Sequence, residues 1–137
     1  ADTIHVSVPA IQLLVKCKPN DKLTLITDAM RAKGLQDGVS ELGGQTVIVK
    51  NGEARLEDGT LAGSVLRMNR AVGNLVEKAG VPLLQAVDYA TINPARTLGI
   101  DGETGGIRVG KLADFAVLDD KFNVLYTIRD GRIVYRA

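Results

Sequence analysis

The sequence predicts an α/β fold in which a strand–helix–strand unit precedes a group of helices and antiparallel β-structure. Three observations support this prediction. Strand-like segments flank a helical pattern within the first 28 residues, an apolar stripe of helical period runs through residues 64–80, and Asn51-Gly52 and Asp130-Gly131 each join two β-rich segments. We therefore expect parallel strands early in the chain and hairpins later.

The composition is that of a globular protein: 45% of the 137 residues are hydrophobic and 24% are charged. The 17 Lys and Arg residues nearly balance the 16 Asp and Glu residues, so no basic excess indicates a nucleic-acid partner. No apolar run approaches the roughly 20 residues of a membrane-spanning helix. We expect no binding to nucleic acid or membrane.

Cys17 is the only cysteine, which excludes an intrachain disulfide and favours a reducing, cytoplasmic location. The chain has no initiator Met and reaches strand-like residues almost at once. We therefore expect a piece of a larger cytoplasmic protein.

The first elements have the size of a βαβ unit. Residues 4–7 are predicted as a strand, Pro9 lies in the first turn of a helix that ends near Pro19, and residues 23–27 are predicted as the next strand. Such a unit implies parallel strands and a right-handed crossover.

A glycine-punctuated loop over residues 29–44 precedes a predicted hairpin over residues 45–57 that turns at Asn51-Gly52. Ser64 is predicted to cap a helix that Gly80 ends. Its apolar stripe consists of Val65, Met68, Val72, Leu75, Val76 and Ala79.

Pro82 is predicted to open a further helix that extends to about Thr91, and Asn93-Pro94 a short one that Gly99 ends. After these helices the chain is predicted to form β-structure, because "ADFAVLD", "NVLYTIRD" and "RIVYRA" each have the pattern of a strand. Asp130-Gly131 joins the last two.

Asp28 and His5 are the candidate catalytic side chains. Asp28 follows directly after a predicted strand, where the active sites of parallel β/α folds lie, and a carboxylate there suits a general base or a metal ligand. A turn-capping role, or an ion pair with Arg31 or Lys33, is an equally good interpretation of Asp28. His5, the only histidine, could reach the same pocket, although a lone histidine is more often half-buried and satisfied by the backbone.

Two glycine-containing segments are candidate ligand sites. "DGTLAGS" at 58–64 is predicted to lead into a helix N-terminus whose amides could bind a polar ligand, with a plain capped helix entry as the simpler interpretation. "GGIRVGKL" at 105–112 departs from a phosphate-binding loop, because Leu112 replaces the required Ser or Thr and a strand follows instead of a helix. Its glycines are better explained as turns.

Together these segments resemble the C-terminal portion of the N-acetylglucosamine-6-phosphate deacetylase family, within the metal-dependent amidohydrolase superfamily. The resemblance covers nearly the whole chain. "TDAM" and "DGTLAGS" at this spacing are its more specific part. The other matching segments are "DTIHV", "ELGG", "NPARTLGI" and "GGIRVGKLADFAVLD".

The resemblance implies the C-terminal fragment of a TIM-like (β/α)8 metal-dependent hydrolase barrel plus part of a small β-sandwich domain. A whole barrel takes about 250 residues, which the chain cannot contain. The implied division is the last barrel β/α units (1–44), a hairpin insertion (45–57), a substrate loop with the C-terminal barrel helices (58–104), and sandwich strands (105–137).

In the family, the aspartate at the position of Asp28 is the general base. It takes a proton from a metal-bound water that attacks the acetamide carbonyl and then returns it to the leaving amine. His5 matches a substrate-pocket histidine, and its neighbours Asp2, Thr3 and Ile4 are assigned to the same pocket. A glycine is common in the family at the position of Thr3. Residues Leu61, Ala62 and Gly63 match a loop that closes over the sugar.

The resemblance implies a divalent metal, such as zinc or iron, whose Glu and His ligands lie on earlier strands outside this chain. The chain alone is therefore expected to be inactive. The implied partners are an amino-sugar phosphate substrate and either a second copy of the protein or the missing N-terminal part.

The resulting hypothesis is hydrolytic deacetylation of N-acetylglucosamine 6-phosphate to glucosamine 6-phosphate and acetate. Two different functions stay open: that of another amidohydrolase, such as an N-acyl-amino-acid deacylase, and that of a non-catalytic β-rich module for binding or assembly.

Overall fold

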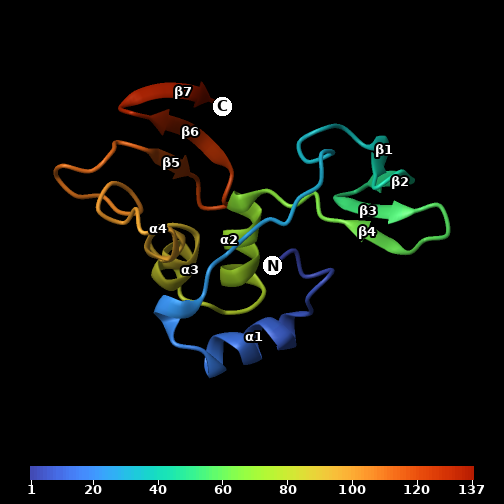
Figure 1. Ribbon diagram of the computed structural model, residues 1–137, viewed down its shortest axis with the longest axis horizontal. Coiled ribbons are helices and arrows are strands. Elements are labelled where there is room, and N and C mark those ends of the chain that lie inside the picture. Colours follow the sequence, from blue (N-terminus) through green and yellow to red (C-terminus); the bar gives the residue numbers. More distant parts are fainter.

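The structure is a computed structural model that describes all 137 residues, and it combines four α-helices with two separate antiparallel sheets (Figure 1). The helices are α1 (Val8–Cys17), α2 (Met68–Glu77), α3 (Leu83–Ala90) and α4 (Ile92–Leu98), and a 3-10 helix, η1, spans Asn20–Lys22. The strands are β1 (Gly38–Leu42), β2 (Gln45–Lys50), β3 (Glu53–Leu56), β4 (Leu61–Gly63), β5 (Phe115–Leu118), β6 (Val124–Arg129) and β7 (Arg132–Arg136).

The helices enclose the larger core, called here the helical core. Its nine buried residues come from α1, the segment after η1, α2, α3 and the turn between the last two: Ile11, Leu25, Ala71, Val72, Leu75, Ala79, Val81, Ala86 and Tyr89. The stripe predicted for α2 is confirmed in part, since three of its members, Val72, Leu75 and Ala79, are buried here. Leu25 is the one member from the segment that leads to Asp28.

Strands β1 to β4 form a meander in sequence order with its own core, called here the sheet core. The hairpin predicted at Asn51-Gly52 is confirmed: Val49 pairs with Ala54, and both turn residues have positive φ, as a two-residue hairpin requires. The sheet core consists of Met30, Ala32, Val47, Val49 and Ala54. Two of these five residues lie just after Asp28.

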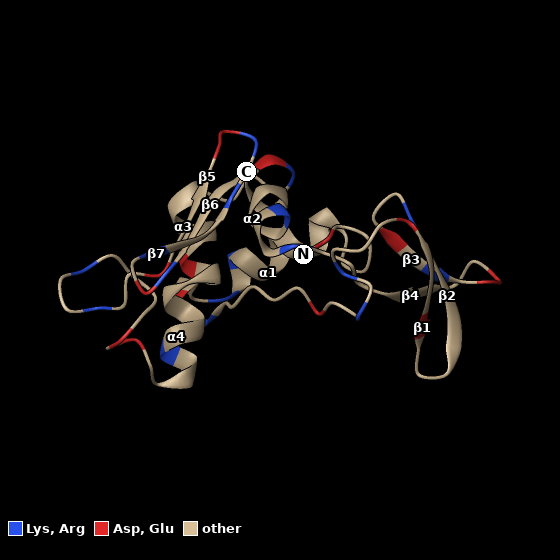
Figure 2. Cartoon of the chain, turned by 90° about the horizontal axis from the view of Figure 1, so that it is seen from above, with Lys and Arg blue, Asp and Glu red and all other residues tan.

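Strands β5, β6 and β7 form the second meander, and its β6–β7 hairpin turns at the predicted Asp130-Gly131 pair. The three predicted C-terminal strands are therefore confirmed. In Figure 1 this sheet lies above the helices, and in both Figures 1 and 2 the β1–β4 sheet extends away at one end of the molecule. Lys and Arg are interspersed with Asp and Glu over the chain in Figure 2, in keeping with the balanced composition.

Two connecting segments join the helices to the β1–β4 sheet. The first runs from Leu23 to Met30, and the second runs from Ser64 to Arg67. They meet at a parallel bridge between Ala29 and Ser64, where the Met30 amide donates to the Ser64 carbonyl at 2.8 Å.

Two of the predicted strands are wrong. Residues 4–7 do not form a strand because the Asp2 carboxylate accepts the Ile4 and His5 amides, which bends the chain. Residues 23–27 are unpaired, with a single backbone hydrogen bond from the Leu25 amide to Tyr89. A parallel strand exists only beside a neighbour that takes its amides and carbonyls, and the chain supplies none here.

The beginning of α2 also differs from the prediction. The helix starts at Met68 with Arg67 as its N-cap, and the Ser64 hydroxyl instead accepts the Leu66 amide. "DGTLAGS" therefore does not lead into a helix N-terminus, because Leu61–Gly63 form β4 beside β3. The helix predicted at Pro82 is confirmed as α3, and the short helix that Gly99 ends is confirmed as α4, where Gly99 has φ 70°. Its predicted start is wrong, because α4 begins at Ile92 with Thr91 as its N-cap and Asn93 lies inside the helix.

No helix in the structure has the length and apolar character needed to span a membrane.

Candidate functional site

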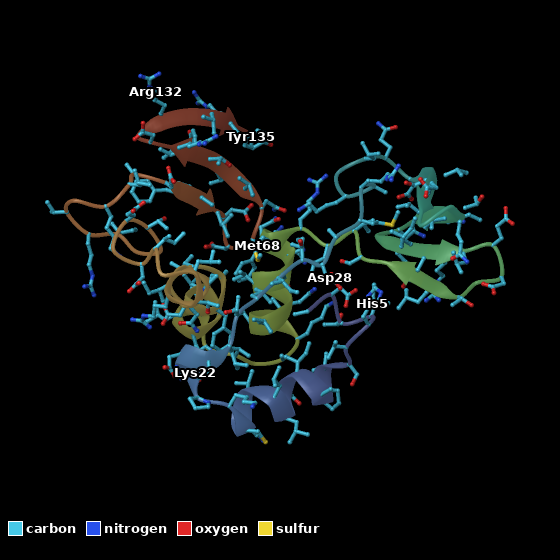
Figure 3. The ribbon with its side chains drawn as sticks, in the orientation of Figure 1. His5, Lys22, Asp28, Met68, Arg132 and Tyr135 are labelled. Carbon is cyan, nitrogen blue, oxygen red and sulfur yellow. The ribbon has the colours of Figure 1, made fainter.

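Asp28 lies at the end of the first connecting segment, between the two cores. Its backbone is left-handed, with φ 49°, and its side chain is exposed (Figure 3). The carboxylate takes part in none of the five ion pairs of the structure. A carboxylate that is not committed to a cation remains free to accept a proton from water.

Asp2 and His5 form a hydrogen-bonded pair. His5 Nδ1 lies 2.5 Å from Asp2 Oδ2, while Asp2 Oδ1 accepts the backbone amides of Ile4 and His5 at 3.0 and 3.1 Å. Burial acts to raise the pKa of the Asp2 carboxyl, but the His5 hydrogen bond and the two amides together lower it below its usual 3.8. Asp2 therefore remains ionised and orients the ring of His5, which leaves Nε2 available to a ligand.

Helix α2 holds this N-terminal turn in place. The buried Asn74 donates from Nδ2 to the Ala1 carbonyl at 3.1 Å, and Lys78 Nζ donates to Thr3 Oγ1 at 3.1 Å. Thr3 has φ 67°, a left-handed conformation that a β-branched residue rarely adopts. Glycine adopts it without strain.

The predicted sugar-contacting residues Leu61, Ala62 and Gly63 form β4, and all three are half-buried. Strand β4 ends at Gly63, and the next residue, Ser64, is bridged to Ala29. Asp28 directly precedes Ala29. The predicted general base therefore adjoins one residue of this bridge, and the predicted sugar-contacting strand adjoins the other.

His5 and Asp28 both lie in the central part of the molecule, between α1 and the β1–β4 sheet, in the view of Figure 3. The five ion pairs do not include one between them. The general-base role of Asp28 and the substrate contacts of Asp2, Thr3, Ile4 and His5 stay predictions.

The chain does not assemble a metal centre from its own side chains. No three His, Cys, Asp or Glu side chains lie close enough together to hold an ion. A site of three or four such ligands therefore does not fit the donors of residues 1–137 alone.

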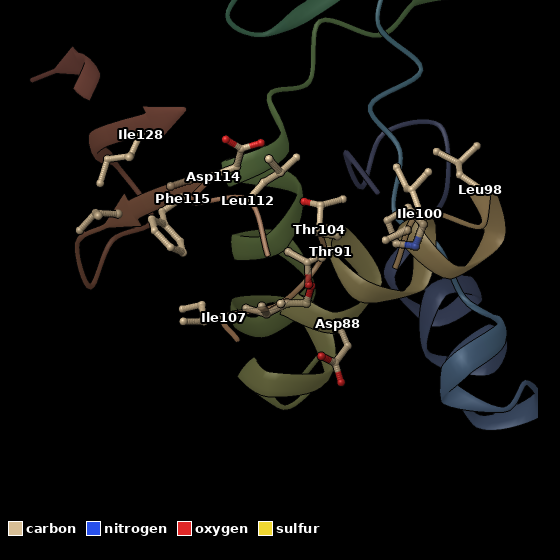
Figure 4. Close-up of a pocket in the computed structure, with 18 of the residues that line it drawn as sticks. Asp88, Thr91, Leu98, Ile100, Thr104, Ile107, Leu112, Asp114, Phe115 and Ile128 are labelled. Carbon is tan, nitrogen blue, oxygen red and sulfur yellow. The ribbon is translucent and has the colours of Figure 1, made fainter. Parts of the chain in front are cut away.

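A large hollow lies elsewhere in the structure. It measures about 890 Å³ and is open, between α3, α4 and strands β5 and β6 (Figure 4). Twelve of its 19 lining residues are hydrophobic, and neither Asp28 nor His5 is among them. It has the character of an uncovered packing surface rather than of the site around Asp28.

Sequence reasoning missed the residues that hold the Asp28 segment. Asn93, 2% exposed, donates from Nδ2 to the carbonyls of Asn20 and Leu23 at 2.6 and 2.7 Å. Met30 fixes the other end through its amide and its buried side chain. The sequence signal for that second contact is an apolar residue, Met30, only two positions after the exposed carboxylate of Asp28.

A family model supplies the class of protein. The model described as the amidohydrolase family matches residues 9–134, and the chain belongs to that family.

Within it, the similar proteins are amino-sugar-phosphate deacetylases. The chain is 42% identical over 135 residues to N-acetylglucosamine-6-phosphate deacetylase of Bacillus subtilis, covering 98% of this chain and 34% of the relative. It is also 42% identical over 124 residues to N-acetylgalactosamine-6-phosphate deacetylase of Escherichia coli O157:H7, covering 90% and 33%. The chain thus spans about a third of the length of these relatives.

Solved structures agree. N-acetylglucosamine-6-phosphate deacetylase of Pasteurella multocida superposes with a TM-score of 0.90 at 36% identity, over 96% of this chain and 35% of that one. An aspartate-to-alanine variant of the Mycobacterium smegmatis deacetylase, in complex with N-acetylglucosamine 6-phosphate, superposes with a TM-score of 0.87 at 36% identity, over 97% and 36%. The predicted α/β class is confirmed, and the chain corresponds to part of the deacetylase fold.

Proposed function

We propose that the protein containing this chain hydrolyses the acetamide of N-acetylglucosamine 6-phosphate, giving glucosamine 6-phosphate and acetate in amino-sugar catabolism. The observation that carries the proposal is the match of nearly the whole chain to deacetylases of this substrate, with a TM-score of 0.90 for the Pasteurella multocida enzyme.

Asp28 is the general base and acid in this proposal. Its exposed carboxylate, free of ion pairs, accepts a proton from the attacking water and returns it to the amine as the amide bond breaks. Proton return matters because an amine leaves far more readily than its anion. One carboxylate serves both steps because it is protonated in the first and deprotonated in the second.

His5 and β4 hold the substrate. The hydrogen bond between His5 Nδ1 and the Asp2 carboxylate fixes the orientation of the ring, so Nε2 is the ring nitrogen left for a hydrogen bond to a ligand. Leu61, Ala62 and Gly63 are all half-buried and offer the sugar one larger apolar side chain and two small residues.

A divalent metal, zinc, iron or a similar ion, supplies Lewis-acid polarisation of the acetamide carbonyl when bound. Residues 1–137 offer no cluster of three donors, so its ligands are proposed to lie in the part of the relatives' fold that this chain does not span. The proposed location is cytoplasmic, and the proposed partner is a second copy or the part of the relatives' fold that this chain does not span.

N-acetylgalactosamine 6-phosphate is the second candidate substrate. The 42% identity to its deacetylase equals the identity to the Bacillus subtilis enzyme. The two sugars differ in the orientation of one hydroxyl, and a site that hydrogen-bonds one orientation rejects the other strongly. The ratio of kcat/KM values for the two phosphates, measured on the full-length protein, decides between them.

Two further functions have less support. An N-acyl-amino-acid deacylase activity is tested by including N-acyl amino acids in the same substrate panel. A non-catalytic binding module requires residues 1–137 to unfold cooperatively by themselves.

The test of the reaction is Asp28→Asn in the full-length, metal-loaded enzyme, with acetate release as the measurement. We expect kcat to fall by about 10²–10⁴-fold, with metal content unchanged. Asp120→Asn, at an exposed carboxylate outside the site, is the matched control. Wild-type turnover by Asp28→Asn would refute the assignment of the base.

A further inference from the structure

The segment that carries Asp28 is anchored in both cores. Leu25, three residues before Asp28, is 8% exposed in the helical core, and Met30, two residues after it, is 8% exposed in the sheet core. Asp28 itself lies exposed between these anchors. The position of its carboxylate therefore depends on how the second anchor is held.

The second anchor is a backbone contact. The Met30 amide donates to the Ser64 carbonyl at 2.8 Å, and Ala29 is bridged to Ser64. Asp28, immediately before the bridge, has φ 49°. A non-glycine residue persists in this conformation only where its surroundings impose it, and the bridge is the nearest such restraint.

Gly63 completes the anchor by leaving room for Met30. A Cβ on Gly63 would lie 3.0 Å from Met30 Sδ, 3.3 Å from Met30 Cγ and 3.2 Å from Leu42 Cδ2. The φ of Gly63 is not positive, so this position needs glycine for packing space and not for backbone freedom. The two segments approach closely because one of them has no side chain here.

We propose that Met30 is a positioning residue: by packing on Gly63 and bonding to Ser64, it fixes the Asp28 carboxylate relative to the sugar-contacting strand β4. This inference rests on the proposed function, because it takes Asp28 as the base and β4 as the strand that contacts the sugar. The β1–β4 sheet then acts as the rigid support of the general base.

The physical reason is that the rate of proton transfer depends strongly on the position of the base. A general base must come within hydrogen-bond reach of the proton that it abstracts, and a displacement of about 1 Å costs on the order of 10²-fold in rate. Met30 packs with Val47, which is fully buried, and with Val49 and Ala54. A side chain fixed in a close-packed sheet core moves little.

The first experiment is kinetic and uses the full-length, metal-loaded enzyme. Met30→Ala is expected to lower kcat by about 10- to 100-fold and to change KM much less, because an interaction felt mainly in the transition state affects kcat. Met30→Leu conserves the volume and is expected to restore most of kcat. A wild-type kcat for Met30→Ala would overturn the proposal.

A double-mutant cycle separates packing on Met30 from direct contact with the sugar. Gly63→Ala is expected to lower kcat in the wild-type background but to have little further effect beside Met30→Ala, because the Met30 atoms that it meets are then absent and the remaining contact is with the exposed side chain of Leu42. An equal fold-loss in both backgrounds would mean that the new methyl group acts elsewhere, and would contradict the proposal.

Gly73→Ala is the matched control. Gly73 lies in α2, its φ is not positive, and a Cβ there would meet the Phe122 ring at 3.1 Å. The same methyl group is thus inserted against a packed neighbour at the helical core. We expect a lower melting temperature with kcat retained, and an equal loss of kcat would show that destabilisation alone explains the Met30 effect.

Hydrogen exchange provides a readout that needs no substrate. The residue-30 amide is expected to be protected in the wild type, to exchange at least about tenfold faster in Gly63→Ala, and to keep its protection in Gly73→Ala. An unchanged rate in Gly63→Ala would overturn the anchor.

The two proposals fail separately. If Asp28→Asn stays active while Gly63→Ala releases the residue-30 amide, the proposed function has failed and the anchor stands. If Asp28→Asn is inactive while Met30→Ala keeps kcat, the positioning role has failed and the function stands.

Discussion

Thr3 occupies a backbone conformation that suits glycine. With φ 67°, a β-branched residue carries about 1–3 kcal/mol of strain. Replacement by glycine removes this strain, but the greater loss of chain entropy on folding offsets about 0.5–1 kcal/mol of that gain. We expect Thr3→Gly to raise the free energy of unfolding of the full-length protein by about 1 kcal/mol, as measured by urea denaturation. Thr3→Val keeps the strain and loses only the contact with Lys78, so a gain in stability there would contradict this explanation.

The Asp2–His5 pair makes stability depend on pH in the acid range. The pKa of Asp2 is lower in the folded protein than its usual 3.8, so the unfolded chain binds more protons as the pH falls. The stabilisation is therefore complete above about pH 4 and is lost as the pH falls through the folded-state pKa.

Asp2→Asn is accordingly expected to flatten the rise of unfolding free energy that accompanies an increase in pH from the acid range to about pH 4. Urea denaturation at a series of pH values measures this slope. Asp120→Asn is the control at an exposed carboxylate, and an equal flattening in that variant would argue against a special role for Asp2.

At the scale of elements, Gly105 shows why the glycines of "GGIRVGKL" need no phosphate ligand. It has φ 81°, and a Cβ would lie 2.7 Å from Ala95 Cβ and 3.1 Å from Ile92 Cα, so the glycine lets this loop lie against α4. Gly105→Ala is expected to destabilise the protein by roughly 2–4 kcal/mol, from overpacking and backbone strain together.

Gly102→Ala is the control for that measurement, because nothing lies within 4 Å of its Cβ position and its φ is not positive. Its effect on the denaturation midpoint should be small. A comparable loss in the two variants would mean that the close approach at Gly105 contributes little.

Asn93 ties α4 to the segment that leads to Asp28. One buried amide nitrogen donates to two carbonyls, so Asn93→Asp would face both with an oxygen instead of a donor. We expect a loss of roughly 2–4 kcal/mol in unfolding free energy, whereas Asn123→Ala, at an exposed asparagine, should cost less than about 1.5 kcal/mol. Equal losses would contradict the role given to Asn93.

The elements that the sequence predicted correctly are those with local causes. The two hairpins follow from Asn51-Gly52 and Asp130-Gly131, and the start of α3 and end of α4 follow from Pro82 and Gly99. The strands predicted over residues 4–7 and 23–27 were wrong because a strand is defined by partners distant in sequence. Strands β1 and β4 were missed because they are short and flanked by glycine.

The candidate site shows the same difference between residues that have a local sequence signal and contacts that depend on distant partners. Asp28 and His5 could be chosen from residue type and from the family motif, and Asp2 was placed in the same pocket. The sequence did not reveal that Asp2 is bonded to His5, or that Met30 and Asn93 hold the Asp28 segment. Those contacts depend on the packing of two cores, which no local pattern encodes.

Residues 1–137 expose more surface than a folded chain of their size normally does. A folded chain of 14.6 kDa exposes about 6,900 Å², whereas this one exposes 9138 Å² and buries only 19 of its 137 residues. Large apolar side chains contribute to the excess, among them Val39, Leu84, Ile107 and Val109. Uncovered apolar surface of this extent favours association.

Residues 1–137 expressed alone are therefore expected to self-associate, or to bind the part of the relatives' fold that they do not span. Size-exclusion chromatography with light scattering measures the first outcome, and co-expression with that remaining part tests the second. A monomer that unfolds cooperatively by itself would contradict this expectation and would favour the non-catalytic module.

The separation of the two cores has a consequence for how such an enzyme diverges. Mutations at the turns Gly43-Gly44 and Asn51-Gly52, which close the hairpins of the β1–β4 sheet, leave the helical core untouched. Substitutions that reach Gly63 or Met30 alter the anchor of Asp28 at once. We therefore expect substitutions to accumulate more readily on the exposed surface of the β1–β4 sheet than in the short stretch that joins the two cores.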